Sequence, residues 1–190
     1  MFHLTGITPA LSQTCKDASF RALDIVSEAN LTVSFDTNIR LSLWSKQEAQ
    51  KTLLPMLKKA DIVFTEPSDA EILLGTRDPE ETAEALFSIG VETVAIKLGE
   101  DGAVAFTKEK SVRKPAFKVP VVDVIGAGDA FAAGFISSII RGQSLEKALE
   151  VGNAAGALVV TVRGDIENLP SSEDIQKFLA AHRKEITDLR

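Results

Sequence analysis

The sequence is poor in the residues on which much enzyme chemistry is built. Its 190 residues include one cysteine, Cys15, and two histidines, His3 and His182, near opposite ends. A lone cysteine excludes an internal disulfide and favours a reducing, cytoplasmic location. With so few soft ligands, catalytic zinc and Ser–His or Cys–His nucleophiles are also disfavoured.

The chain also lacks a long hydrophobic run and an excess of positive charge. Its longest nearly apolar stretches, Ala130–Ile140 and Ala154–Val160, are much shorter than the roughly 20 residues of a membrane-spanning helix. No signal-peptide pattern is present at the start. With 21 Lys and Arg against 27 Asp and Glu, the formal net charge is −6. We therefore expect small-molecule partners, with no nucleic acid and no membrane.

What the sequence does contain is an alternation of short β-branched runs and helical patterns. Strands are predicted at 2–7, 31–35, 61–65, 93–96 and 103–107, and helices at 12–30, 46–59, 68–74, 79–89, 127–141, 144–162 and 171–182. Such alternation implies right-handed crossovers and a mostly parallel sheet with helices on both faces. Because no repeat or linker interrupts the pattern, a single α/β domain over residues 1–190 is predicted.

Polar residues follow four strands, three predicted above and one inferred. They lie at 36–40, 66–71, 97–102 and 126–129, the last after the strand-like run VVDVI (121–125). Ligands of open α/β sheets bind outside the carboxyl ends of the strands. If the sheet is parallel, these groups meet at one edge and form a binding cleft.

The stretch GAGD (126–129) is the most informative of the four. Gly126 and Gly128 permit a tight turn and close approach of a ligand to the backbone. The first amides of the helix that follows have no internal partner and form an anion site. Asp129, kept ionised in this field, could accept a proton from a hydroxyl held beside a phosphate. The plainer alternative is that Asp129 only caps the helix.

A dinucleotide-binding site is the alternative to the anion site for the same glycines. A Rossmann fingerprint requires a small residue where this chain has Phe131. Glu146, at the spacing of the ribose-binding acid, falls in a helical pattern instead of at a strand end. An NAD- or flavin-dependent oxidoreductase is therefore disfavoured.

Several stretches together resemble the ribokinase-like (PfkB) carbohydrate kinases. DVIGAGDAFAAGF is similar to the C-terminal signature of that family, and FDTNIRLSLW (35–44) resembles its 2-keto-3-deoxygluconate kinases. PSDAE (67–71), KLGEDGA (97–103) and GNAAGALVVTVRGD (152–165) follow in the family's order. The resemblance implies a three-layer, ribokinase-like (Rossmann-like) fold. It also implies ATP-dependent phosphorylation of a sugar or sugar acid, with ATP and Mg²⁺ as cofactors.

The resemblance also implies a role for individual residues. Asp129 would be the base, and the amides of Gly126, Ala127 and Gly128 the anion hole for the transferring phosphoryl group. Arg40 would bind the substrate's carboxylate and Asn38 would support that loop. Without the family context, Arg40 could equally be an exposed loop cation.

Nucleotide and metal positions are implied in the same way. The nucleotide-binding set is Ser68, Lys97, Gly99, Glu100, Gly102, Gly126, Gly128 and Asn153. Glu71 would hold Mg²⁺, although Ser68 and Glu71 could instead form a capping box. Gly99 and Gly102 could simply turn the chain between two strands. A monovalent cation, K⁺, would be held near Asp123, Val159, Gly164 and Asn168.

The family's N-terminal segment, with its β-lid and sugar-recognition glycines, has no counterpart in this sequence. That leaves two further hypotheses open. The chain could be a non-catalytic nucleotide-binding fragment, or a subunit completed by a separate N-terminal segment. An apolar surface or strand edge left uncovered by that segment would also favour a homo-oligomer.

Overall fold

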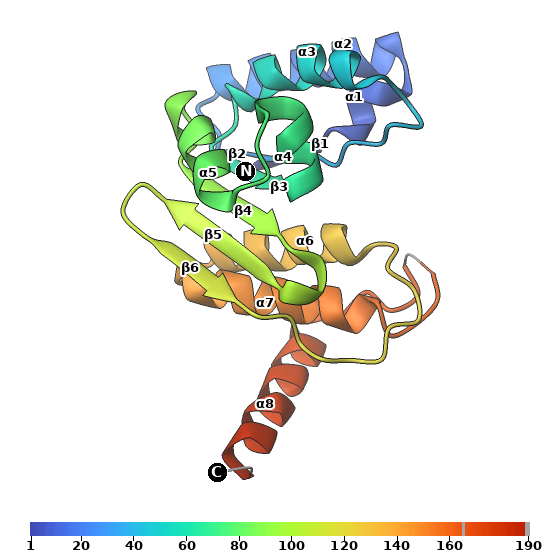
Figure 1. Cartoon of the computed structure of the whole chain (residues 1–190), viewed down its shortest axis with the longest axis vertical. Helices are drawn as coiled ribbons and strands as arrows, with labels where there is room; N and C mark the ends of the chain where they lie inside the picture. The colour runs from blue at the N-terminus through green and yellow to red at the C-terminus, as the bar shows by residue number, and fades with distance from the viewer. Residues whose placement is uncertain (165, 189–190) are drawn as a thin grey trace. The chain divides into compact units, whose positions relative to one another are not determined.

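The computed structural model describes residues 1–164 and 166–188, with side chains described up to Arg183 (Figure 1). It divides into two units, each described here by itself. Unit 1 is Met1–Leu98 with Val104–Ser111, and unit 2 is Gly99–Ala103 with Val112–Arg190. The prediction of a single domain is not decided by this division and stays a prediction.

Strands and helices alternate through the first half of the chain, as the sequence pattern predicts. In chain order the elements are β1 (Phe2–Thr5), α1 (Ile7–Leu11), α2 (Gln13–Glu28), β2 (Val33–Asp36), α3 (Lys46–Leu57), β3 (Ile62–Thr65), α4 (Pro67–Leu74), α5 (Pro79–Ser88), β4 (Thr93–Lys97), η1 (Gly99–Asp101), β5 (Ala103–Thr107), β6 (Ser111–Lys114), α6 (Ala127–Ile140), α7 (Leu145–Val159) and α8 (Ser172–Asp188). Figure 1 follows them from blue β1 to red α8.

The sheet has six strands in the order β1-β2-β3-β4-β5-β6. β1 to β4 pair in parallel, with Leu4 opposite Phe35 and Phe35 opposite Val63. Every residue of β2 and β3 is buried, as expected for central strands covered on both faces. The mostly parallel sheet predicted from the sequence is confirmed.

Local sequence explains where the helices of unit 1 begin. α3 begins after Ser45, whose hydroxyl accepts the Glu48 amide while the Glu48 carboxylate accepts the Ser45 amide. This reciprocal capping box satisfies amides that the helix itself leaves unpaired. α5 begins with Pro79 after Asp78, whose carboxylate accepts the amide of Glu81 at 2.9 Å. Proline fits that first position because its missing N–H is not needed there.

In unit 2, α6 and α7 pack closely through small residues. A Cβ added at Gly134 would lie 3.0 Å from the carbonyl oxygen of Val151. One added at Gly152 would lie 2.9 Å from the ring of Phe131. Glycine at these positions therefore lets the two helices approach nearly backbone to backbone. The buried side chains of this unit include Ala154, Ala155, Val159, Ile175 and Leu179.

Two predicted strands differ from the structure. The strand predicted at 2–7 ends at Thr5, because Gly6 donates its amide to the carbonyl of Asp36 at 2.8 Å and the chain turns into α1. The inferred strand 121–125 is wrong, and these residues form a loop. The Asp123 carboxylate accepts the amide of Ile125 at 3.1 Å, a local turn that replaces a strand ladder. The short polar strand β6 has no counterpart among the predicted strands.

Among the described residues, no helix is both long and apolar enough to cross a membrane.

Gly6→Ala is expected to destabilise the protein, because the added Cβ would overlap the carbonyl oxygen of Thr37. We expect the free energy of unfolding in urea to fall by about 3 kcal/mol, the upper end of the usual overpacking range. Gly142→Ala is the control: its Cβ meets open space, so only the left-handed backbone (φ 69°) costs stability, about 1 kcal/mol. Equal effects of the two substitutions would contradict the proposed overlap.

Candidate functional site

A buried ion pair lies at the carboxyl ends of β2 and β4. The ammonium group of Lys97 lies 2.8 and 3.1 Å from the two carboxylate oxygens of Asp36, whose side chain is 1% exposed. Glu66, at the end of β3, lies 3.7 Å from the same ammonium group. Charges can be buried here because they neutralise one another. Lys97, predicted to contact nucleotide, is thus held toward Asp36.

Asp69 organises the neighbouring loop, a role that the sequence analysis missed. One of its carboxylate oxygens accepts the hydroxyl of Thr37 at 2.7 Å and the amide of Ile39 at 3.0 Å. The Thr65 hydroxyl lies 3.1 Å from that of Thr37. Asp69 is 7% exposed, and this burial raises the pKa of its carboxyl group despite the two hydrogen bonds. The loop after β2 is therefore fastened to the first turn of α4.

The fastened loop carries both predicted substrate-binding residues. Asn38 is partly buried and adopts a left-handed backbone with φ 33°, which asparagine tolerates better than most residues. Arg40 is exposed, and its carbonyl accepts the amide of Leu43 at 2.9 Å. Its guanidinium forms no ion pair with any described residue. The loop thus presents a cation at its tip from a fixed backbone.

The beginning of α4 differs from the capping-box alternative. Glu66 is the N-cap and Pro67 the first helical residue, so Ser68 lies inside the helix and no side chain caps it. The capping box of Ser68 and Glu71 is therefore wrong. Both residues are exposed, and Glu71 accepts a hydrogen bond from the Arg77 guanidinium at 2.8 Å.

A metal site is not preformed in the described residues, which contain no cluster of three His, Cys, Asp or Glu side chains placed to hold an ion. The oxygens of Glu71 are nevertheless the kind of hard ligand that Mg²⁺ prefers. Because Mg²⁺ usually keeps several waters and binds through few carboxylates and substrate phosphates, an exposed single carboxylate fits it.

In unit 2, the stretch GAGD forms the beginning of α6. Gly126 is the N-cap with a left-handed backbone (φ 79°), and no side chain caps the helix. Ala127 donates its amide to Val124 at 3.3 Å. Gly128 and Asp129 complete the first turn, where helix amides have no partner within the helix. Asp129 is exposed while Ala130 is buried, so the carboxylate lies at the open end of a largely buried helix.

The residues predicted to lie around the nucleotide have structural roles in unit 2. Gly99 and Gly102 enclose the turn η1, with φ of 61° and 90°, and Glu100 between them is exposed. These glycines do turn the chain between β4 and β5, and their role over the nucleotide stays a prediction. Gly102 cannot carry a side chain, because a Cβ would overlap the carbonyl of Lys114. Asn153 is 8% exposed, and its amide donates to the carbonyls of Lys114 and Pro115 at 3.1 and 3.0 Å.

The four predicted cation-site residues lie on two segments that hydrogen bonds join within unit 2. Asp123 accepts the amides of Ile125 at 3.1 Å and Gly164 at 3.4 Å, which lower the pKa of its carboxyl group. The Val159 carbonyl accepts the amide of Val162 at 3.4 Å. Asn168 donates to Leu158 and Thr161. The structure thus brings Asp123 beside Gly164, with backbone oxygens nearby.

Comparison with known proteins identifies the family of the chain. The family model described as pfkB family carbohydrate kinase matches residues 1–172. The chain belongs to this family. It is 40% identical over 183 residues to 2-dehydro-3-deoxygluconokinase of Bacillus subtilis, covering 95% of this chain and 56% of the relative. It is 42% identical over 181 residues to the Thermoproteus tenax enzyme of the same name, covering 94% and 54%.

A solved structure shows the same fold. An Escherichia coli protein assigned as ribokinase II, in complex with ATP and Mg²⁺, superposes with a TM-score of 0.89 at 30% identity. The match covers 95% of this chain and 58% of that one. The three-layer, ribokinase-like α/β class predicted from the sequence is confirmed. This pfkB chain spans a little over half the length of the curated relatives it matches.

Asp69→Asn is expected to retain both hydrogen bonds, because an amide oxygen can accept them, whereas Asp69→Ala leaves two buried donors without an acceptor. We expect Asp69→Ala to lower the free energy of unfolding by about 2 kcal/mol or more, and Asp69→Asn by clearly less. Urea unfolding at neutral pH measures both. Equal losses would contradict the fastening role.

The same pair tests the raised pKa of Asp69. A folded-state pKa above the ordinary 3.8 means that the folded protein binds the proton more tightly than the unfolded chain does. This stabilisation is present below pH 3.8 and is lost as pH rises toward the raised pKa. The parent should therefore lose stability relative to Asp69→Asn as pH rises through that window. A constant difference between the two would contradict the shift.

Proposed function

We propose that this pfkB chain supplies the nucleotide-binding and catalytic part of an ATP-dependent sugar kinase. The expected substrate is a 2-keto-3-deoxy sugar acid, with 2-keto-3-deoxygluconate the first candidate. Two relatives at 40% and 42% identity carry the name 2-dehydro-3-deoxygluconokinase, which supports this choice. Because the chain spans a little over half the length of each relative, the activity of the whole relatives is a proposal for this chain.

One observation supports the proposal above all others: an exposed carboxylate and uncapped helix amides share the first turn of α6. The amides of Gly126, Ala127 and Gly128 would form the anion hole for the γ-phosphoryl group, with Ala127 giving up its 3.3 Å hydrogen bond to the Val124 carbonyl. Asp129 would accept the proton of the sugar hydroxyl as its oxygen bonds to phosphorus and ADP leaves. Transfer of this kind depends mainly on positioning and charge stabilisation, which an uncapped helix end provides.

The loop fastened by Asp69 is proposed to bind the acid end of the sugar. Arg40 is exposed and forms no ion pair among the described residues, so its planar fork is available to a carboxylate. Asn38 holds the left-handed turn that directs it. A sugar acid would thus be distinguished from a neutral sugar by this contact.

The remaining implied residues are proposed to serve the nucleotide and its ions. The loop Gly99, Glu100 and Gly102 would pass over the nucleotide, with Asn153 shaping the adenine pocket through the 114–115 backbone. Ser68 and Lys97 would lie toward its phosphates, and Glu71 would hold Mg²⁺ through water; the E. coli neighbour binds ATP with Mg²⁺. The ion supplies charge stabilisation for the transferring group. Asp123, Val159, Gly164 and Asn168 would hold K⁺.

The proposal includes a location and a partner. We propose a cytoplasmic protein, on the argument from its single cysteine. A further polypeptide segment equivalent to the unmatched part of the relatives, or a second copy of the chain, is proposed to complete the sugar site. Activity assays are therefore designed both without and with such a segment.

Asp129→Asn is expected to reduce phosphoryl transfer to 2-keto-3-deoxygluconate by at least about 10²-fold, the lower end of the contribution of a general base. ATP·Mg²⁺ affinity, measured by titration calorimetry, should change by less than several-fold. Glu80→Gln is the matched control, since Glu80 is likewise an exposed carboxylate in the first turn of a helix, α5. Transfer is measured for the chain alone and with the added segment.

The outcomes separate the alternatives. A fully active Asp129→Asn variant would remove Asp129 from the role of base. ATP binding without transfer under either condition would favour a non-catalytic nucleotide-binding chain. Binding of NAD in place of ATP would overturn the kinase proposal altogether.

Arg40→Gln is expected to raise the KM for the sugar acid by about tenfold or more, the usual effect of losing a charged hydrogen bond, with a much smaller change in kcat. A neutral sugar should lose nothing, because it has no carboxylate for Arg40 to bind. Arg21→Gln, an exposed arginine of α2, is the matched control. Steady-state kinetics with both substrates measures the effect, and an unchanged KM for the acid would contradict the assignment.

A further inference from the structure

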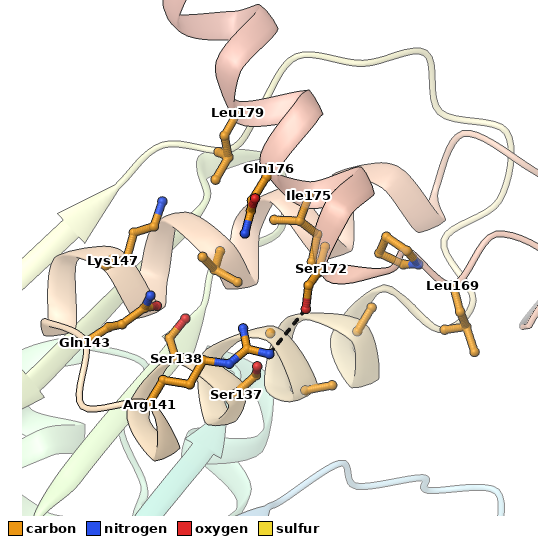
Figure 2. A pocket seen from close by; sticks show the side chains of 16 residues that line it. Ser137, Ser138, Arg141, Gln143, Lys147, Leu169, Ser172, Ile175, Gln176 and Leu179 are labelled. Atoms are coloured by element: carbon orange, nitrogen blue, oxygen red, sulfur yellow. Dashed lines mark hydrogen bonds between the residues drawn. The ribbon is translucent and has the colours of Figure 1, made fainter.

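A cavity lies wholly within unit 2, between α6, α7 and the beginning of α8 (Figure 2). Its volume is about 210 Å³. One wall consists of small residues of α6, among them Ala130, Ala133 and Gly134. Toward the carboxyl end of α6 the lining becomes polar, with Ser137, Ser138, Arg141, Gln143, Lys147, Ser172 and Gln176. No role proposed above uses this polar end.

Positive charge predominates at the polar end. Arg141 donates to the hydroxyl of Ser172 at 3.3 Å, and it forms no ion pair within the described part of the chain. Lys147 lies 2.7 Å from a carboxylate oxygen of Glu150, which Arg183 also contacts at 3.0 Å. Glu150 thus pairs with two cations, and Arg141 remains without a carboxylate partner among the described residues. In the view of Figure 2, the Lys147 side chain extends away from Arg141, and Ser138 lies between the two.

The acidic residues at the beginning of α8 do not offset this charge. Glu173 pairs with Lys177 at 2.7 Å, within α8 itself. The carboxylate of Asp174 accepts the amide and hydroxyl of Ser171 at 2.9 and 2.6 Å. Both carboxylates thus have local partners, whereas Arg141 is bonded only to a neutral hydroxyl.

Ser138 is the second observation that indicates a ligand. It is 1% exposed and lines the cavity. Among the described residues its hydroxyl makes no hydrogen bond. Within the described residues the sealed side-chain atom that lacks a partner is the indole nitrogen of Trp44, so the Ser138 hydroxyl is reachable from the cavity and can bond a polar ligand there.

We propose that this cavity binds a small phosphomonoester, such as a sugar phosphate. Its phosphate group binds the guanidinium of Arg141 and accepts the hydroxyl of Ser138, and Lys147 adds positive charge to the same polar end. The amide groups of Gln143 and Gln176 face the remaining polar atoms of the ligand, and the alanine-lined wall accommodates its carbon skeleton. A cavity of this volume has room for a compact metabolite.

This site is separate from the proposed catalytic one, although both lie along α6. Asp129 stands in the first turn of the helix, and Arg141 is its C-cap residue. At 1.5 Å per residue, the twelve intervening steps place the two residues about 18 Å apart along the axis. Binding at one end can therefore be located independently of binding at the other.

The experiment titrates the ¹⁵N-labelled chain with glucose 6-phosphate, inorganic phosphate, gluconate and glucose, and follows amide chemical shifts. We expect saturable shifts at 137–147 and 172–176 with glucose 6-phosphate, weaker ones with inorganic phosphate and none with glucose. Arg141→Gln should weaken glucose 6-phosphate binding by about tenfold or more, since a charged hydrogen bond is lost. Ser138→Ala should weaken it by several-fold without affecting folding. Arg21→Gln, in unit 1, is the matched control.

Each remaining outcome counts against the proposal. Shifts confined to 126–130 would place the phosphate at the beginning of α6. Equal binding of glucose, or of gluconate, would show that the site does not select a phosphate. No binding at millimolar concentrations, or unchanged affinity in both folded variants, would overturn the site. None of these results depends on kinase activity, so the proposed function stands or falls separately.

Discussion

The buried pair of Asp36 and Lys97 is the interaction on which the polar edge of unit 1 depends. β2 and β4 end in Asp36 and Lys97, whose side chains are 1% and 11% exposed, whereas Glu66 at the end of β3 is half exposed. An unpaired charge at Asp36 would be costly, whereas a pair at 2.8 Å is tolerated. The loop that follows Asp36 is held by Asp69, which accepts the Thr37 hydroxyl and the Ile39 amide. The backbone that leads to Arg40 is fastened in this way.

Much of the fold could be predicted because its signals are local. Runs such as LTVSF and DIVFT are short, β-branched and followed by polar residues, and they became β2 and β3. VVDVI has the same composition but forms a loop, because a strand requires a partner and Asp123 offers the backbone a competing turn. The mistaken capping box at Ser68 has a similar cause: Pro67 begins α4 one residue earlier, and Glu66 takes the N-cap position.

The residues of the candidate site also differ in whether their roles could be predicted from local sequence. GAGD is a contiguous signal, and its glycines, helix beginning and exposed carboxylate could all be inferred from neighbouring residues. Asp69 could not, because its two partners lie about 30 positions earlier in the sequence and meet it only once β2 and β3 are paired. Asp36 is 61 positions from Lys97, and the Lys114 carbonyl is 39 positions from Asn153, so these contacts are still more distant in sequence. Side-chain assignments that depend on tertiary contacts therefore had to await the structure.

The glycine contacts between α6 and α7 affect the direction in which the amides of GAGD point. Packing through long side chains fixes their rotamers. This lowers the free energy of unfolding by up to about 2 kcal/mol for each side chain. Gly134, Gly152 and Gly156 have no rotamers to fix, so at these three points the helices meet through main-chain and small groups. The direction in which the first turn of α6 points is then set by main-chain geometry, with little side-chain motion to blur it. A phosphate would meet donors whose orientation was established when the chain folded.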